Sequence, residues 1–179
     1  DLGSDSMLEP IAKYVKLFRL PHYRVGDTEQ YHSSSYNKFV VARSVIDAQV
    51  VINMPKMKTH CKAGMTGALK NFVGMVAVRH CYTNYRKGSP EHHGDEYPYP
   101  SAIKTISDAI ERKVDGLQAG PARSLLTLAH RVNERIRNML GIDGIRDGAW
   151  FGNDTVWRAI VDLVRIARYG KTDGTMSSD

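Results

Sequence analysis

Apolar residues recur at helical spacing in three stretches of the second half of the chain. This spacing predicts amphipathic helices over Ser101–Val114, Pro121–Leu140 and Asp154–Arg168. Pro121 suits the first turn of its helix, and Gly141 is a suitable residue to end it. Ser101 is a candidate N-cap for the first helix, and the Gly152–Thr155 segment has the composition of a cap for the third.

The first half of the chain contains shorter and less regular apolar patterns. They predict a helix over Met7–Leu20 that Pro21 stops, and a polar turn or edge hairpin over His22–Asn37. A short strand over Lys38–Ala42, one or two helical turns over Arg43–Ala48 and a buried strand over Val50–Asn53 follow.

Residues 82–100 are rich in proline and glycine, which predicts a long loop. The loop holds the densest group of metal-ligand residue types in the chain, namely His92, His93, Asp95 and Glu96. Their spacing matches no zinc signature, so we favour a solvated loop over a metal site.

The stretch from Ala48 to His80 has the strongest functional character. It begins with the predicted strand Val50–Asn53, and no Asp or Glu occurs from Ala48 through Arg86. In an open α/β sheet, ligands bind at the carboxyl ends of the strands. The stretch is rich in small, amide and cationic residues, the latter being Lys56, Lys58, Lys62, Lys70 and Arg79.

Within this stretch, Gly64, Gly67, Lys70 and Asn71 follow a Gly-x-x-Gly-x-x-Lys-Asn pattern. The spacing is not that of a Walker phosphate loop. Small residues at a helix start still allow backbone N–H groups to approach an anion, and a lysine adds charge. Thr66 is the expected N-cap of that helix. Tight packing with solvated lysines is the alternative reading.

Composition places few limits on function. The chain has 179 residues, 42% hydrophobic and 25% charged, with a net charge of +6, so we expect a single folded domain over 1–179 with a basic surface. Two cysteines form no disulfide framework and no iron–sulfur site alone, which favours a reducing, cytoplasmic location. No apolar run approaches membrane-span length. The chain begins at Asp1 rather than Met, and we expect it to be part of a longer protein.

The motifs of residues 40–170 resemble domain-of-unknown-function (DUF) family 362. The resemblance rests on Pro55-Lys56-Met57-Lys58-Thr59-His60, on Gly64-Met65-Thr66-Gly67-Ala68-Leu69-Lys70-Asn71, on His80, and on Gly152 through Asp162. Some members of that family carry a ferredoxin-type iron–sulfur module. This chain has only two cysteines, so no iron–sulfur cluster is expected in it alone.

The spacing from His60 to Lys70 is also distantly similar to the nickel-pincer lactate racemase family. That similarity implies that Lys70 faces a nucleotide cofactor and that His60 moves a proton at the substrate carbon. It also implies His80 as a metal ligand, although His80 lies closer to Lys70 than the corresponding histidine would. Ala68-Leu69 replace the small residues that precede the family's lysine.

Taken together, the sequence predicts an α/β fold with a parallel or mixed sheet flanked by helices, Rossmann-like and racemase-like. The first functional hypothesis is an enzyme acting on a small anionic metabolite with a metal or phosphate-bearing cofactor, in which His60 and Lys70 are catalytic. Supporting contacts are expected from Lys56, Lys58, Thr59, Gly64, Thr66, Gly67 and Asn71. The alternatives are an anion-binding or redox accessory module and, last, a nucleic-acid-binding protein. A membrane partner is not expected.

Overall fold

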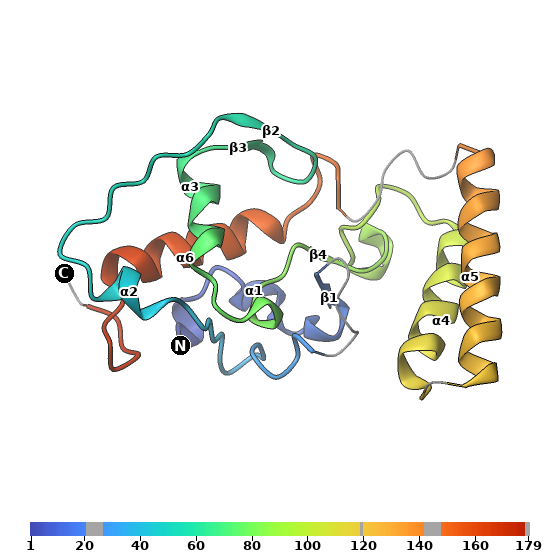
Figure 1. The fold of residues 1–179 in the computed structure, drawn as a ribbon, viewed down its shortest axis with the longest axis horizontal. Helices are drawn as coiled ribbons and strands as arrows, with labels where there is room; N and C mark the ends of the chain where they lie inside the picture. The colour runs from blue at the N-terminus through green and yellow to red at the C-terminus, as the bar shows by residue number, and fades with distance from the viewer. Residues whose placement is uncertain (21–26, 119, 142–147, 178–179) are drawn as a thin grey trace.

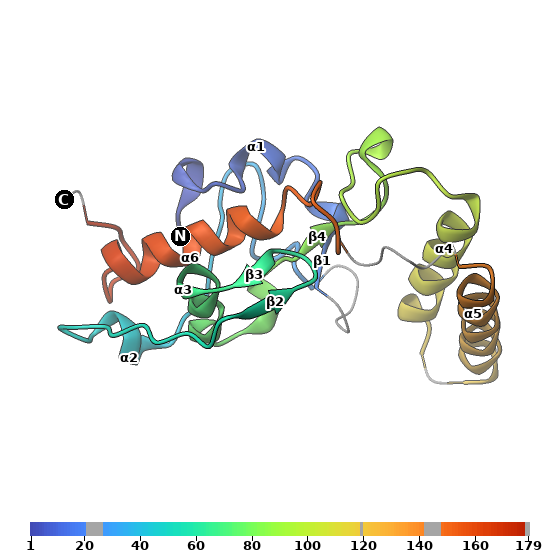
Figure 2. The same cartoon turned by 90° about the horizontal axis from the view of Figure 1, so that it is seen from above.

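The computed structural model describes residues 1–20, 27–118, 120–141 and 148–177. Two parts are distinct in Figure 1. The body comprises the described residues of 1–100 and 148–177. The hairpin consists of two long helices, α4 (Ala102–Gly116) and α5 (Pro121–Met139), and it extends from one end of the body in both views (Figures 1 and 2).

The body is built from short elements around one long helix, α6 (Val156–Tyr169). In chain order the short elements are η1 (Gly3–Asp5), α1 (Glu9–Ala12), η2 (Val15–Leu17), β1 (Phe18–Arg19), α2 (Arg43–Ile46), β2 (Lys58–His60), β3 (Gly64–Thr66), α3 (Ala68–Asn71), η3 (Phe72–Met75), η4 (Arg79–Cys81), β4 (Tyr85–Arg86) and η5 (Pro90–His92).

The four short strands pair as two separate antiparallel ribbons. β1 pairs with β4, with Phe18 opposite Arg86, and β2 pairs with β3, with His60 opposite Gly64. The predicted parallel or mixed, Rossmann-like sheet is therefore wrong for the described residues. The fold is mixed α/β and mostly helical.

The predicted buried strand Val50–Asn53 is also wrong. The segment has no strand structure, and Val50 and Ile52 are 76% and 78% exposed. A single extended segment satisfies its backbone groups only where a neighbouring strand pairs with it. The sequence window around Val50 carries no information on whether that neighbour exists.

The core of the body forms where α6 meets the first residues of the chain. Leu8, Phe18 and Leu163 are almost completely buried and belong to the same hydrophobic cluster. The Asp162 carboxylate accepts hydrogen bonds from the Ser6 hydroxyl (2.5 Å) and the Met7 N–H (2.8 Å). Burial raises the pKa of Asp162, and these bonds oppose that rise. Asp162 thus fixes the N-terminal segment on α6.

The long helices match their predicted positions. α4, α5 and α6 occur within a few residues of the predicted ranges, and α2 accounts for the helical turns predicted over Arg43–Ala48. Ser101 caps α4, because its hydroxyl accepts the Lys104 N–H (3.4 Å). Among the described residues, no helix is long and apolar enough to cross a membrane.

The secondary structure predicted for the N-terminal part of the chain is mostly wrong. Met7–Leu20 is not one helix, because Phe18 and Arg19 extend to pair with β4, and only Glu9–Ala12 is α-helical. Lys38–Ala42 contributes an isolated bridge between Val41 and Val76 in place of a strand. Pro21 and the first part of the predicted turn, 22–26, lie outside the described residues. The remainder of that turn contains one bridge, His32 to Asn37.

Candidate functional site

His60 is the last residue of β2, and its side chain folds over the turn of the β2–β3 hairpin. The His60 Nδ1 accepts hydrogen bonds from the backbone N–H groups of Lys62 (3.1 Å) and Ala63 (3.2 Å). Two donors on Nδ1 place the proton of the neutral imidazole on Nε2. Gly64 closes the turn with φ of +70°, a conformation that glycine adopts without strain.

Positive charge gathers at this turn. Burial lowers the pKa of His60, and Lys70, Lys62 and Lys58 lower it further. Burial also lowers the pKa of Lys70, with the nearby Cys61 raising it and Lys62 lowering it. The imidazole is therefore held neutral, while the Lys70 ammonium lacks part of its hydration.

α3 carries Lys70 and begins at Ala68. Gly67 is the N-cap and no side chain caps the helix, so the prediction of Thr66 as N-cap is wrong. Thr66 instead ends β3, opposite Lys58. The Asn71 amide donates to the Asn53 Oδ1 (2.7 Å), and the Asn53 amide donates to the Ala68 carbonyl (2.6 Å). Asn71 therefore secures the extended segment on α3.

A pocket of about 640 Å³ opens between this hairpin, α3 and the start of α6. Of the predicted site residues, Gly64, Gly67 and Lys70 line it. The rest of its lining is mostly apolar or aromatic. It consists of Cys61, Lys62, Ala63, Met65, Ala68, Leu69, Trp150, Phe151, Asn153, Val156, Trp157, Ile160 and Val161.

The other predicted residues lie around the pocket or away from it. His60 is half-buried beside Cys61, whereas the side chains of Lys56, Lys58 and Thr59 are exposed on the hairpin and the segment before it. The Thr66 hydroxyl is buried and has no hydrogen-bond partner within the described part of the chain.

His80, the predicted metal ligand, is in η4 and is not part of the pocket lining. Its Nδ1 lies 3.3 Å from a carboxylate oxygen of Asp27. In the described ranges no three His, Cys, Asp or Glu side chains are grouped so as to hold a metal ion. A metal role for His80 stays a prediction.

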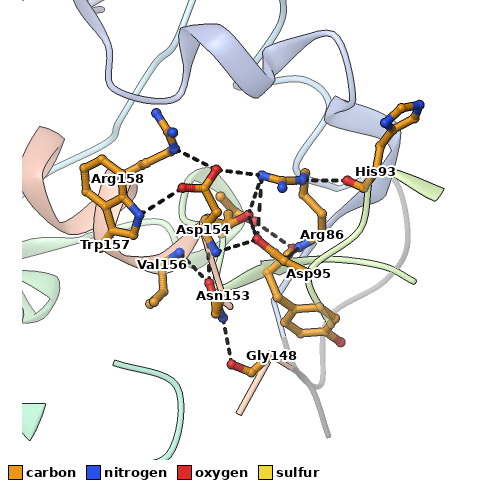
Figure 3. A network of polar contacts seen from close by, with 12 residues as sticks. Arg86, His93, Asp95, Gly148, Asn153, Asp154, Val156, Trp157 and Arg158 are labelled. Atoms are coloured by element: carbon orange, nitrogen blue, oxygen red, sulfur yellow. Dashed lines mark hydrogen bonds and ion pairs between the residues drawn. The ribbon is translucent and has the colours of Figure 1, made fainter. Parts of the chain in front are cut away.

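A buried carboxylate, that of Asp95, organises a network of polar contacts at the start of α6 (Figure 3). Asp95 is 1% exposed and Glu96 is 7% exposed, so the prediction that this loop cluster is solvated is wrong for both carboxylates, although His92 and His93 are exposed. Asp95 accepts hydrogen bonds from the Arg86 N–H, the Asp154 N–H (3.0 Å) and the Thr155 hydroxyl (2.6 Å).

Charge around Asp95 is balanced by arginine. Burial raises the pKa of Asp95, while Arg86, whose Nη1 lies 3.6 Å away, lowers it. The same Nη1 lies 3.8 Å from Asp154, which also pairs with Arg158 at 3.1 Å. A carboxylate this deeply buried requires such partners, because an unpaired buried charge is strongly destabilising.

Asn153 fixes the first turn of α6. Its amide donates to the carbonyls of Asn84 and Gly148 (both 2.9 Å), and its Oδ1 accepts the N–H groups of Thr155 (3.1 Å) and Val156 (2.9 Å). Thr155 is the N-cap of α6 and makes no side-chain cap bond, so within the predicted capping segment Gly152–Thr155 it is Asn153 that accepts the N–H groups at the helix start.

This polar network holds two tryptophans at the pocket. The Trp150 indole N–H donates to the Asp95 carbonyl (2.8 Å), and the Trp157 indole N–H donates to the Asp154 carboxylate (3.1 Å). Sequence reasoning assigned neither tryptophan to the site. The available signal was their place in the Gly152–Asp162 motif or next to it.

Comparisons with known proteins cover the chain unevenly. The family model described as "Domain of unknown function (DUF362)" matches residues 5–175. The thylakoid-associated protein sll1697 of Synechocystis sp. is 43% identical over 44 residues, which are 25% of this chain and 14% of the relative's own length. No solved structure matches. Neither match supports the similarity to lactate racemases.

Proposed function

The chain belongs to the DUF362 family, and we propose that its His60–Asn71 loop binds a small anionic metabolite for an enzymatic reaction. The observation that carries the proposal is Lys70. Lys70 lines a mostly apolar pocket, its ammonium is partly desolvated, and within the described residues no carboxylate pairs with it. A ligand carboxylate or phosphate would supply the missing negative charge and restore the pKa of the ammonium.

His60 is the proposed partner of Lys70 in the reaction. Because its Nδ1 is occupied by two backbone donors, the neutral ring offers the Nε2–H to a ligand. A neutral imidazole N–H can polarise a substrate oxygen where charge develops during the reaction. Burial and three neighbouring lysines lower the pKa of the ring, which favours the neutral form that this role needs. The geometry favours donation over proton abstraction.

A phosphate-bearing cofactor is compatible with the same anion contact. Gly64 and Gly67 put backbone next to the pocket without side chains, and the Thr66 hydroxyl is buried without a partner in the described part. We propose these residues, with Lys70, as the anion-facing set, and Lys56, Lys58, Thr59 and Asn71 as peripheral. Elemental analysis and mass spectrometry of the purified protein test for a metal or nucleotide. An empty protein that binds only phosphate favours the accessory module.

The direct test of the anion contact is a measurement of phosphate affinity by calorimetry or NMR. Lys70→Gln removes the charge next to the apolar pocket, and we expect phosphate affinity to fall at least tenfold, or about 1.4 kcal/mol. Lys58→Gln removes an exposed charge from the same hairpin and is the matched control. We expect it to change affinity by about twofold or less, because solvent screens it.

Thermal unfolding separates a lost contact from a lost fold. Both variants should melt within a few degrees of the parent chain. Equal loss of phosphate binding in Lys70→Gln and Lys58→Gln would contradict the proposal and favour diffuse attraction to a basic loop. A steep salt dependence of binding to nucleic acid would then support the third hypothesis.

A further inference from the structure

The wall that residues 150–157 form in the pocket is aromatic. Both tryptophans of the chain and Phe151 line the pocket that Lys70 also lines. A site for a bare inorganic anion gains nothing from such a wall, because small anions bind through charge and hydrogen bonds. The wall therefore indicates that part of the ligand is apolar.

The rings are fixed rather than loosely placed. The Trp150 indole N–H donates a hydrogen bond to the Asp95 carbonyl (2.8 Å), and the Trp157 indole N–H donates one to the Asp154 carboxylate (3.1 Å). These bonds hold one edge of each ring. The network that holds Asp154 and Asp95 is drawn in Figure 3. Ring orientation is thus set by groups outside the pocket.

Gly152 is part of the same arrangement. A Cβ atom at Gly152 would lie 2.2 Å from the six-membered ring of Trp150, so the ring rests directly on the glycine backbone. Arg158 lies 4.6 Å from the Trp157 ring centre. The Phe151 ring meets Trp150 edge-on, with centroids 5.4 Å apart and planes at 68°. The two tryptophan rings consequently have set orientations, and the Phe151 ring lies edge-on to Trp150.

The exposure of these rings argues against a purely structural role. Phe151 is completely exposed, and Trp157 is 41% exposed. Aromatic rings that stabilise a fold do so by being buried. Rings that border a pocket and remain in contact with water leave apolar surface for a ligand to cover.

We propose that the ligand of this site is an aromatic anion, a flat ring that carries a carboxylate or phosphate. Its charged group contacts Lys70, and its ring lies against Trp150, Phe151 and Trp157. This inference rests on the proposed function, because that function places the anionic group at Lys70. What it adds is the aromatic ring of the ligand. Gly152 and Asp154 act as positioning residues, because they set the tryptophan rings.

Three probes separate charge from ring. They are 1-naphthoate, which has both, 1-naphthalenemethanol, which has the ring alone, and acetate, which has the charge alone. The two indole N–H signals in the NMR spectrum both come from the pocket wall, since the chain has two tryptophans. We expect 1-naphthoate to shift both signals and to bind at least tenfold tighter than either other probe. Equal affinity for acetate and 1-naphthoate would overturn the inference.

Variants test each half of the ligand. Trp157→Leu should weaken 1-naphthoate at least fivefold and leave phosphate affinity within twofold. Gly152→Ala should weaken 1-naphthoate by displacing the Trp150 ring, visible as a moved Trp150 indole signal. Tyr99→Leu is the matched control, because Tyr99 is an aromatic residue that is 78% exposed and outside the pocket. A Tyr99→Leu effect as large as that of Trp157→Leu would also overturn the inference.

The two proposals fail in different ways. If 1-naphthoate and phosphate both depend on Lys70 but Trp157→Leu changes neither, the anion site stands and the aromatic ligand is wrong. If 1-naphthoate binding depends on Trp157 but Lys70→Gln leaves both probes unaffected, the anion contact is wrong, and so is the charged half of the inferred ligand.

Discussion

The body and the hairpin bury opposite kinds of surface. In the body, α6 buries the apolar face that contains Leu163, and the polar side chains beside it are held in a network around Asp95. In the hairpin, α5 directs polar residues such as His130 towards α4, where His130 Nδ1 lies 3.4 Å from the Ser107 hydroxyl. Five large apolar residues of α5 are left exposed, namely Leu125, Leu128, Val132, Ile136 and Met139.

The spacing of those exposed residues, three or four positions apart, is that of one helix face. α5 is the outermost element in both views, with α4 between it and the body (Figures 1 and 2). The comparison shows that a helical pattern in the sequence predicts a helix without predicting what the apolar face contacts. Stability should therefore reside in the body, and single changes in each part should differ sharply in effect.

The largest expected effect is that of Asp95→Ala. It removes the acceptor of three hydrogen bonds and leaves Arg86 without its closest carboxylate. We expect the free energy of unfolding to fall by about 3–5 kcal/mol. Urea denaturation measures this loss, and Asp47→Ala, at an exposed i,i+4 pair with Arg43, is the control, with an effect below about 1 kcal/mol. Similar losses in both would contradict a central role for the network.

The next largest effect is a loss of stability at low pH that is caused by the buried His32. Burial lowers the pKa of His32 from 6.5 to about 4, against hydrogen bonds to Cys81 and Asn37 that raise it. In that window the unfolded chain binds a proton that the folded chain does not, so stability falls as pH falls. The loss from pH 6.5 to 4 should reach about 3 kcal/mol.

The measurement is the slope of the free energy of unfolding against pH. A His32→Gln variant should lose this part of the slope, even if it is less stable at neutral pH. An unchanged slope in the variant would show that other groups cause the acid sensitivity.

A pair of leucines compares the two parts directly. Leu163 in α6 is completely buried, and Leu163→Ala should cost about 2–5 kcal/mol because it leaves a cavity. Leu128 in α5 is 58% exposed, and Leu128→Ala should change the free energy of unfolding by about 0.5 kcal/mol or less. Comparable losses at the two positions would mean that the α5 stripe is covered in solution.

The parts of the fold that the sequence predicted are those set by local rules. The long helices follow from apolar periodicity, and Ser101 caps α4 as expected. The Val50–Asn53 strand failed because a strand needs a partner that no local window contains. The Met7–Leu20 helix failed for a related reason, since Phe18 and Arg19 pair with residues more than sixty positions away.

The candidate site was predicted in part for the same reason. The loop containing Gly64, Gly67 and Lys70 is one local motif, and all three residues line the pocket. The aromatic wall comes from residues some eighty positions later, and Asp95, which helps to hold it, was assigned to a solvated loop. Its burial depends on Arg86 and Thr155, which only the tertiary structure brings together.

The most direct test of the central claim is an NMR titration of the Lys70 side-chain ammonium with and without phosphate, assigned with the Lys70→Gln variant. Burial lowers the pKa of Lys70 below its ordinary value in the ligand-free chain. An anion bound at the ammonium favours the charged form, so we expect saturating phosphate to raise that pKa. A Lys70 pKa that does not move with phosphate would contradict the account.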